Sequence, residues 1–344
     1  MKSGQVTIKD IARELQISPS TVSRALKDHP DISPETKKAV NELAEKLNYQ
    51  PNTIALSLRQ SKTNTIGVII PEIVHFFFSS VISGIEDIAY EAGYNVIIAQ
   101  TNESYEREVT TARALFNSRV DGLLVSISKE TDDFAHLESL HSRGVPMVFF
   151  DRICESLDTS KVIVDDFQGA FDATEHLIQQ GCKRIAHLAG PLNLLIGQQR
   201  LDGYKKALAK HDIPYEEALV KDSGGTNEEK SRAETNVLLT LDNPPDAIFA
   251  NNDLAALGAL KAVKAKGLSA PEDVAIVGFS NWQFSELTDP PLSTVIQPGV
   301  EIGQESAKLL IREIEMKEDE YIAPETKTLK TTLLVRKSSD RSLT

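Results

Sequence analysis

Residues 18–33 read SPSTVSRALKDHPDIS, and this stretch decides how the start of the chain folds. Ser18 is a predicted N-cap, and Pro19 follows at the first helical position, where the N–H that proline lacks has no helical partner. The inner side of the predicted helix is apolar and consists of Val22, Ala25 and Leu26. Its outer side is polar and rich in hydrogen-bond donors, and consists of Ser20, Thr21, Ser23, Arg24 and Lys27.

Two further predicted helices flank this one. In VTIKDIARELQ, which begins at residue 6, Thr7 and Asp10 form a capping-box arrangement ahead of an apolar stripe of Ile8, Ile11, Ala12 and Leu15. Ser33-Pro34 repeats the start signal, and the third stripe consists of Val40, Leu43, Ala44 and Leu47. Two short helices joined by a tight turn, with a third in support, are typical of a helix-turn-helix domain.

The polar side of the second helix suits duplex DNA. Short hydroxyl side chains allow a helix to enter the major groove, and an arginine there can bind guanine O6 and N7 with two hydrogen bonds. The alternative that the pattern alone leaves open is a small three-helix module with a solvated face.

The distribution of charge favours the first reading. The whole chain has a formal net charge of −13, but residues 1–62 hold ten Lys and Arg against seven Asp and Glu. Residues 1–62 therefore have a formal net charge of +3, and the remainder of the chain has a formal net charge of −16. A basic segment on an acidic chain indicates that only this segment meets a polyanion, although uneven charge also arises by chance.

Length and composition narrow the class of protein. A chain of 344 residues favours two or three domains. The opening MKSGQVTIKD has no apolar signal region, and no run of about 18 apolar residues exists, so we expect no membrane span. Cys154 and Cys182 are far apart and read as incidental thiols in a reducing compartment. We therefore expect a cytoplasmic protein.

The chain resembles the LacI–GalR family of bacterial transcription regulators. The resemblance lies in VTIKDIARELQISPSTVSRAL and in the later NYQPNTIALSLRQSKTNTIGVIIP. It continues through GIEDIAYEAGYNV, RVDGLLV, FFDR, QQRLDGYKKAL, NNDLAALGALKA, DVAIVGF and PPLSTVIQP. It therefore covers nearly the whole chain, and it implies an effector domain with the fold of periplasmic binding proteins.

Residues 51–62 are predicted to link the first domain to the rest. Pro51 ends the third helix, and TIALSLR after Asn52 is too short to be a stable helix alone, so we expect residues 51–60 to be poorly helical without DNA. The resemblance implies that two such hinges fold on the operator, where Leu58 enters the minor groove beside Ala55, and Arg59 lies near phosphate. Alternatively, Ile54, Leu56 and Leu58 pack on the main body.

These considerations give one set of DNA-binding candidates. They are Thr7, Ile8, Ser18, Pro19, Ser20, Thr21, Ser23, Arg24, Lys27, Asn52, Ala55, Leu58 and Arg59.

From Thr65 onward, short apolar runs alternate with helical patterns in two successive sets. This alternation predicts two α/β lobes with doubly wound parallel sheets and a ligand cleft at the carboxyl ends of the strands. We expect a helix-turn-helix domain over 1–50 and an effector-binding and dimerisation domain over 63–344. Its first lobe is expected over 63–163 and 294–325, and its second over 164–293 and 326–340.

Side chains at or near the predicted strand ends form the candidate effector site. They are Phe76, Phe77, Asp151, Arg152, Gln198, Arg200, Asn252, Asp253, Phe279, Ser280, Trp282 and Gln297. Aromatic faces with planar donors and carboxylates suit a sugar or sugar derivative, and purines stay open. The resemblance implies that Arg200 clamps the effector, that Asn252 and Asp151 bind it by hydrogen bonds, and that Phe76 packs on it.

One position departs from the family. Where members commonly have aspartate after GF, this chain has Ser280, which puts the usual effectors in doubt and makes Trp282 a stacking candidate. Structural alternatives also stay open: Phe76, Phe77 and Trp282 in a core or dimer face, Arg200 paired with Asp202 or another acid, and Asp253 as an N-cap.

Evidence for catalysis is weak. GFSNW lacks the second glycine of a nucleophile elbow, no phosphate-binding loop is present, and the histidines at 136, 141, 176 and 187 lack metal-ligand spacing. We expect no cofactor or metal, and a homodimeric, effector-controlled repressor of a pseudo-palindromic operator. The competing hypotheses are a solute-binding protein with a vestigial head and an α/β enzyme acting on a sugar.

Overall fold

The structure is a computed structural model that describes residues 6–49, 62–317 and 321–343. It divides the chain into two compact units, Met1–Asn64 and Thr65–Thr344. The described part of the first unit is called the head below, and the second unit is called the body.

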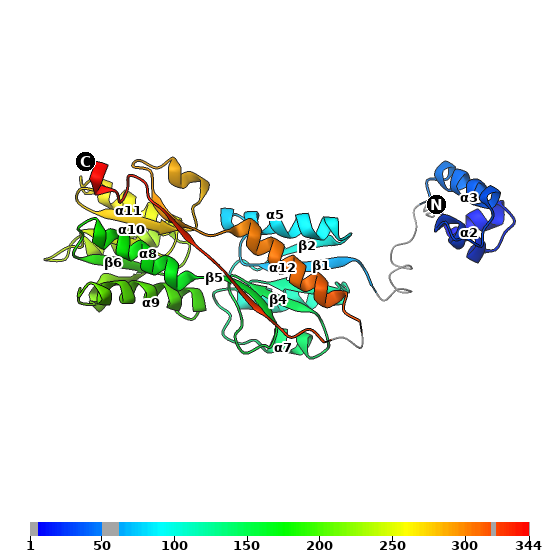
Figure 1. The fold of residues 1–344 in the computed structure, drawn as a ribbon, viewed down its shortest axis with the longest axis horizontal. Helices are drawn as coiled ribbons and strands as arrows, with labels where there is room; N and C mark the ends of the chain where they lie inside the picture. Colours follow the sequence, from blue (N-terminus) through cyan, green and yellow to red (C-terminus); the bar gives the residue numbers. More distant parts are fainter. Residues whose placement is uncertain (1–5, 50–61, 318–320, 344) are drawn as a thin grey trace. The chain divides into compact units, whose positions relative to one another are not determined.

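The head consists of three helices, as the apolar stripes predict (Figure 1). They are α1 (Ile8–Glu14), α2 (Pro19–Leu26) and α3 (Pro34–Lys46). Ser18 caps α2, since its hydroxyl accepts a hydrogen bond from the Thr21 N–H at 3.0 Å, and Ser33 caps α3 in the same way through the Thr36 N–H at 3.3 Å. Asp10 accepts from both the N–H and the hydroxyl of Thr7, which is the N-cap of α1.

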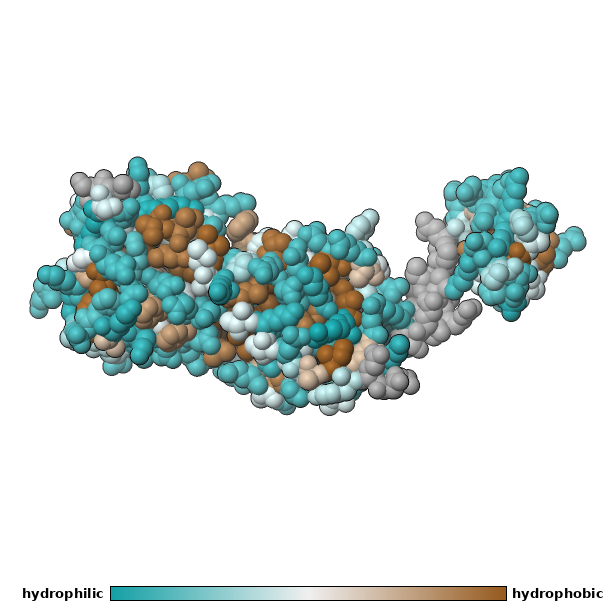
Figure 2. All heavy atoms as spheres, in the orientation of Figure 1, coloured by the Kyte–Doolittle hydropathy of each residue, from teal (hydrophilic) through white to brown (hydrophobic). Residues whose placement is uncertain are grey.

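The apolar stripes meet in one small core. Its fully packed members are Ile11, Ala12, Val22, Ala25, Val40 and Ala44. Figure 2 shows that the surface over these helices is mostly hydrophilic. Most apolar residues of the head therefore lie in its core, where they hold the helices together.

The first lobe of the body is a six-stranded, all-parallel sheet in the order β11-β5-β4-β3-β1-β2. Its strands are β1 (Thr65–Ile70), β2 (Asn95–Gln100), β3 (Gly122–Val125), β4 (Met147–Phe150), β5 (Ser160–Val164) and β11 (Thr326–Leu329). Its helices are α5 (Phe76–Glu91), α6 (Tyr105–Asn117), α7 (Ala135–His141) and α12 (Gly299–Ile314).

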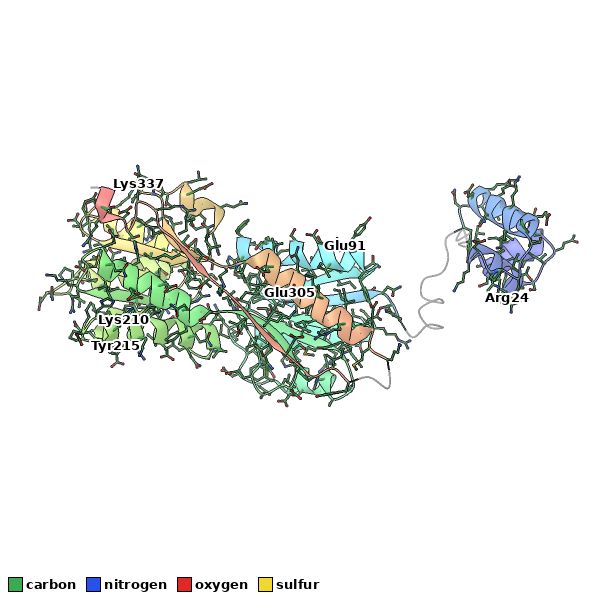
Figure 3. All side chains as sticks on the ribbon, in the orientation of Figure 1. Arg24, Glu91, Lys210, Tyr215, Glu305 and Lys337 are labelled. Atoms are coloured by element: carbon green, nitrogen blue, oxygen red, sulfur yellow. The ribbon has the colours of Figure 1, made fainter. Side chains whose placement is uncertain are left out.

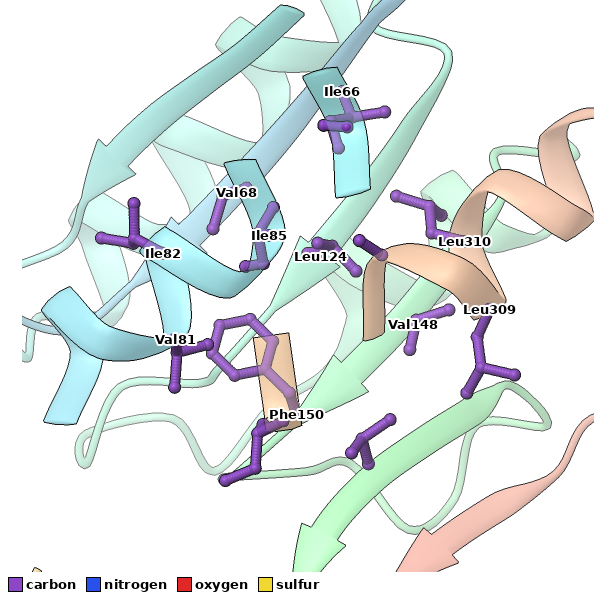
Figure 4. Close-up of a cluster of buried hydrophobic side chains, with 14 of the residues drawn as sticks. Ile66, Val68, Val81, Ile82, Ile85, Leu124, Val148, Phe150, Leu309 and Leu310 are labelled. Atoms are coloured by element: carbon purple, nitrogen blue, oxygen red, sulfur yellow. The ribbon is translucent and has the colours of Figure 1, made fainter. Parts of the chain in front are cut away.

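Helices cover both faces of this sheet. Alternate residues of β1 point to opposite faces, so Ile66 and Val68 pack with α5 and α12 (Figure 4), while Ile69 packs with α6 and α7. α5 and α12 approach closely because glycines lie at their contact: a Cβ on Gly84 would lie 2.0 Å from the Val300 carbonyl oxygen.

The second lobe repeats this plan with the order β12-β10-β9-β8-β6-β7. Its strands are β6 (Ile185–Ala189), β7 (Val220–Asp222), β8 (Ala247–Ala250), β9 (Ala275–Phe279), β10 (Ser293–Ile296) and β12 (Thr332–Leu334). Its helices are α8 (Asp166–Gln179), α9 (Leu195–Lys210), α10 (Glu228–Leu238) and α11 (Asp253–Ala265). α8 and α9 cover one face, and α10 and α11 the other. β12 is antiparallel to β10, so this edge departs from the all-parallel expectation.

The predicted class of two α/β lobes is confirmed, but two predicted lobe boundaries are wrong. β10, expected mostly in the first lobe, pairs with β9 of the second, and β11, expected in the second, pairs with β5 of the first. The chain therefore changes lobe after Ile296 and after Leu329. Short apolar runs look alike in either sheet, and only the hydrogen bonds between strands decide which sheet each joins.

Among the described residues, no helix combines the length and apolar character that crossing a bilayer requires. Within the same residues, no cluster of three or more His, Cys, Asp or Glu is placed to hold a metal ion. Cys154 and Cys182 are buried, free thiols.

Candidate functional site

The outer side of α2 is the candidate DNA-reading surface. Arg24 and Lys27 are exposed on it, and Figure 3 shows Arg24 at the surface of the head. Within residues 6–49, neither side chain has an ion pair, whereas Arg13 pairs with Asp10 and Lys37 with Asp28. The two cations on α2 are therefore free to meet phosphate or base edges.

The other DNA-binding candidates of the head divide by environment. Ser18, Pro19, Ser20 and Thr7 are exposed, Thr21 and Ser23 are half-buried, and Ile8 packs against the head's core. The hydroxyl of Ser18 lies 2.7 Å from that of Ser20 and 2.8 Å from that of Thr21, so capping and the outer face share one hydroxyl cluster. Asn52, Ala55, Leu58 and Arg59 lie outside the described residues.

The candidate effector site is a cleft between the two lobes, beyond the carboxyl ends of their strands. Eight of the predicted residues line it: Phe77, Asp151, Arg152, Arg200, Asn252, Ser280, Trp282 and Gln297. The open space within this cleft is about 60 Å³.

Arg152 forms one buried ion pair in the cleft wall. Its Nη1 donates to both carboxylate oxygens of Glu103, at 2.7 and 2.9 Å, and both side chains are nearly buried. Burial would raise the pKa of Glu103, but the guanidinium beside it holds that pKa below its ordinary value.

Arg200 forms a second buried ion pair, with Asp166 at the start of α8. Its Nε and Nη2 lie 2.8 and 2.7 Å from Asp166 Oδ1, and its Nη1 donates to the Asn251 carbonyl at 2.6 Å. The guanidinium also stacks on the Phe279 ring, 3.8 Å from its centroid. The acid that pairs with Arg200 is thus Asp166 and not Asp202.

Asp253 does not line the cleft. It is fully buried, and its carboxylate accepts hydrogen bonds from the Trp282 N–H and from the hydroxyls of Ser285 and Thr294, at 2.6 to 2.7 Å. Burial raises its pKa to about 6. Its position argues for a structural role in holding the loop after β9. The N-cap of α11 is Asn252, so the reading of Asp253 as an N-cap is wrong as well.

Three further predicted residues lie beside the cleft and not in its lining. Phe76 is half-exposed at the start of α5, Gln198 donates to the Leu192 carbonyl at 2.8 Å, and Phe279 is fully buried beneath Arg200. Strand-end position alone did not separate side chains that face the cleft from those that face the lobe interior.

Some polar side chains that line the cleft already form hydrogen bonds with other groups of the protein. Asn252 caps α11 through its Oδ1 and donates to the Gly225 carbonyl at 2.9 Å through its Nδ2. The Ser280 hydroxyl donates to Gln297 Oε1 at 2.6 Å, which leaves Gln297 Nε2 buried and without a partner in the described chain.

Sequence reasoning missed several lining residues, of which His75 is the most informative. Its ring packs on Trp282 from the other lobe, with centroids 4.9 Å apart, and it contacts the Glu72 carboxylate. The others are Phe78, Pro191, Leu194, Ile196, Gly197, Gly225, Thr226 and Asn251. His75 and Asn251 are direct neighbours of predicted residues, and this adjacency is the signal that could have found them.

A chain with a helix-turn-helix head and a two-lobed body that has a cleft between its lobes is typical of a ligand-responsive DNA-binding protein. Comparison with known proteins supplies the family. Residues 7–52 match the family described as bacterial regulatory proteins, lacI family. Residues 63–332 match the family described as periplasmic binding proteins and sugar binding domain of LacI family.

Individual relatives agree. Catabolite control protein A of Priestia megaterium is 35% identical over 308 residues, which are 89% of this chain and 92% of that protein. The HTH-type transcriptional repressor CytR of Escherichia coli K12 is 34% identical over 97% of this chain and 96% of its own. Among solved structures, a lac repressor dimer bound to operator and the anti-inducer ONPF superposes with a TM-score of 0.85 and 26% identity, covering 98% of this chain and 99% of that one.

The chain belongs to the LacI family of bacterial regulatory proteins. It is a DNA-binding transcription regulator with an effector domain like the periplasmic binding proteins, as the sequence resemblance implied. Of the relatives named above, CytR is a transcriptional repressor by name.

Proposed function

We propose that this regulator binds a pseudo-palindromic operator as a homodimeric repressor and that a sugar bound in the cleft changes its operator affinity. The observation that carries the proposal is a cleft that side chains of both lobes line, some polar and some apolar. A ligand that touches both lobes favours the arrangement in which its contacts are best, and it can therefore shift a two-state protein.

On the DNA side, α2 enters the major groove of each half-site. Arg24, which has no ion pair within residues 6–49, supplies bidentate contacts to guanine, and Lys27 binds phosphate. The hydroxyls of Thr7, Ser18, Ser20, Thr21 and Ser23 supply short donors, and Pro19 lies among them as the first residue of α2. Ile8 supports the face from the core.

The linker over 51–62 completes the reading of the operator. We propose that Leu58 contacts the central base step, where an apolar wedge favours flexible pyrimidine–purine steps, with Ala55, Asn52 and Arg59 beside it. Replacing Leu58 by Ala should reduce the protein's sensitivity to the sequence of that central step, which a set of duplexes varied only there can measure.

A sugar fits the cleft's chemistry. Trp282 and Phe77 offer apolar ring faces, while the polar lining offers planar amides and a carboxylate at Asn252, Gln297 and Asp151. One relative in structure, the transcriptional regulator CelR in complex with cellobiose, has 31% identity and a TM-score of 0.74. It covers 97% of this chain and 99% of its own.

Operator selection followed by a binding assay tests the proposal. Full-length protein is used to select duplexes from a random pool, and anisotropy then measures affinity at two salt concentrations with and without a panel of sugars. We expect steeply salt-dependent, sequence-specific binding that at least one sugar changes, and the direction of that change shows whether the effector releases DNA or promotes its binding.

The competing functions predict other outcomes. A solute-binding protein with a vestigial head would bind sugars but show no salt-sensitive DNA affinity. An enzyme would convert the sugar, which analysis of the recovered ligand after prolonged incubation detects. Selection of no sequence in any condition would overturn the proposal.

A further inference from the structure

A second pocket lies in the first lobe, between α6 and α7, and none of its described lining residues also lines the cleft. α6 contributes one helix face, with the spacing i, i+3, i+4 and i+7: Val109, Ala112, Arg113 and Phe116. α7 and the residues just after it contribute His136, Ser139, Leu140 and Arg143 at the same spacing. The open space is about 490 Å³, within the roughly 300–1,000 Å³ that small-molecule sites span. The pocket is therefore large enough for a ligand of its own.

The pocket combines apolar side chains with two cations. Ala112 and Leu140 are buried, and Phe116 is half-buried. Arg113 and Arg143 are exposed, and neither forms an ion pair with a described residue. The guanidinium carbon of Arg143 lies 5.5 Å from the centroid of the Phe116 ring. Unlike the arginines of the cleft, these two keep their charge available for an anion.

His136 adds a polar atom that has no partner. Only 8% of its side chain is exposed, and its Nε2 lies 3.1 Å from Oε1 of Glu108. That carboxylate is fully buried and only accepts hydrogen bonds, so Nε2 donates to it, and Nδ1 is buried without a hydrogen-bond partner in the described chain. Buried polar atoms are normally paired, which points to a further group that enters between the two helices. A hydroxyl suits this position, because it can both donate to Nδ1 and accept from it.

We propose that the pocket between α6 and α7 is a second small-molecule site, whose ligand is an aromatic carboxylate that also carries a hydroxyl group. The carboxylate pairs with Arg113 and Arg143, since a planar guanidinium can donate two parallel hydrogen bonds to it. The aromatic ring packs on Phe116 and Leu140, and the hydroxyl bonds to His136 Nδ1. This site is independent of the effector that we propose for the cleft.

Calorimetry on the full-length protein tests the chemistry of the ligand. The probes are 2-, 3- and 4-hydroxybenzoate, which place the hydroxyl at different distances from the carboxylate, together with benzoate and the matching hydroxybenzamides. We expect at least one hydroxybenzoate to bind about tenfold more tightly than benzoate, because benzoate lacks the hydroxyl. It should exceed its own amide by about tenfold or more, because the amide lacks the charge.

Substitutions test the place of binding. Arg113→Ala and Arg143→Ala should each weaken binding of the best hydroxybenzoate about tenfold. The matched control is Arg107→Ala, which removes an exposed arginine of α6 that does not line the pocket and should leave the affinity unchanged. Ser139→Phe, at an exposed position, adds a ring to the pocket but keeps both arginines, and it should abolish binding. Thermal unfolding followed by circular dichroism checks that each variant is folded.

Each outcome decides one claim. If no hydroxybenzoate binds at concentrations up to about 10 mM, the proposed site is wrong. Binding that persists in folded Ser139→Phe also overturns the site, as does a loss in Arg107→Ala equal to that in Arg113→Ala and Arg143→Ala, because surface charge alone would then attract the ligand. Equal affinity for benzoate and the best hydroxybenzoate overturns the role of His136, and equal affinity for the amide overturns that of the two arginines.

Discussion

The head and the cleft both present arginines, but their electrostatic situations are opposite. On α2, Arg24 and Lys27 are exposed and have no ion pair within the described head. In the cleft, Arg200 is buried, Arg152 is nearly buried, and both are paired, whereas the carboxylate of Asp151 receives no hydrogen bond from the described residues.

This difference matches two kinds of partner. A polyanion such as DNA is bound by cations that keep their charge available and give up only solvent and counterions. A small molecule in a cleft is bound mainly by apolar side chains, together with a few polar groups that fix its orientation. An arginine in a site is therefore evidence for an anionic ligand only when its partners are known.

The largest expected effect comes from breaking a cleft pair. Arg200→Ala should lower the free energy of unfolding by about 3–5 kcal/mol, because it leaves Asp166 buried and uncompensated. It should also abolish the effector response, since the cleft wall loses its support. Chemical denaturation followed by circular dichroism measures the first, and operator anisotropy with effector the second.

The matched control is Arg312→Ala, which removes an exposed partner of Glu325 and should cost about 0–1 kcal/mol. If both variants lost the same free energy of unfolding, a buried arginine pair would contribute no more to stability than an exposed one, and the prediction would be wrong.

The second prediction concerns how the stability of the body depends on pH. The body has buried titratable groups, whereas the described residues of the head include none. His187 is fully buried between Tyr204 and Phe249, its Nδ1 lies 3.0 Å from the Phe249 carbonyl, and its Nε2 has no partner in the described chain. Burial lowers its pKa to about 4 from an ordinary value of 6.5.

Between these two pH values the unfolded chain binds more protons than the folded one, so the histidine destabilises the body as pH falls from about 6.5 to 4. The contribution of His187 to the free energy of unfolding is complete above pH 6.5. At pH 4 that free energy is lower by roughly 3 kcal/mol. Asp151 and Asp253, whose pKa values are raised to about 6, act in the opposite direction over the same range.

Because these opposite effects overlap, the test compares the free energies of unfolding of two proteins. The stability of wild type minus that of His187→Phe should fall as pH is lowered from 6.5 to 4, measured by denaturant unfolding at several pH values. A pH-independent difference would show that His187 is not buried in its neutral form.

The third prediction sharpens the comparison from the head's side. Arg24→Ala should weaken binding to the best operator by about ten- to a hundredfold and relax base preference at one position, because a bidentate guanine contact contributes roughly 1–3 kcal/mol. Binding to random duplex should change little. Arg13→Ala is the control, because Arg13 already pairs with Asp10, and an equal loss there would remove the special role of α2.

The smallest effect is expected for Lys27→Ala. Loss of one phosphate contact should weaken binding evenly across sequences and reduce the slope of log affinity against log salt by about one. Lys38→Ala on α3, whose ammonium lies 3.9 Å from Glu42, should leave the slope unchanged. An altered base preference for Lys27→Ala would instead place Lys27 at a base edge.

Much of the architecture could be predicted because its signals are local. Ser18, Ser33 and Thr7 mark helix starts through hydrogen bonds that reach only three residues along the chain. A short apolar run, such as that of β1, likewise predicts a buried strand whichever sheet that strand joins.

The site was predicted less completely, because facing a cleft is not a local property. Asp151, Arg200 and Trp282 line it, but Phe279 and Asp253, equally close to strand ends, face the lobe interior. His75 lies next to the predicted Phe76, but no local pattern indicates that its ring meets Trp282, more than two hundred residues later.

By itself, the sequence determined the helix-turn-helix head, the two α/β lobes and the family, because capping, periodicity and motif spacing act over short stretches. Only the tertiary structure decided which sheets β10 and β11 join, and that Arg152 and Arg200 are balanced by Glu103 and Asp166. The physical reason is that strand pairing and the balance of buried charge depend on groups that are distant in the chain and become neighbours only on folding.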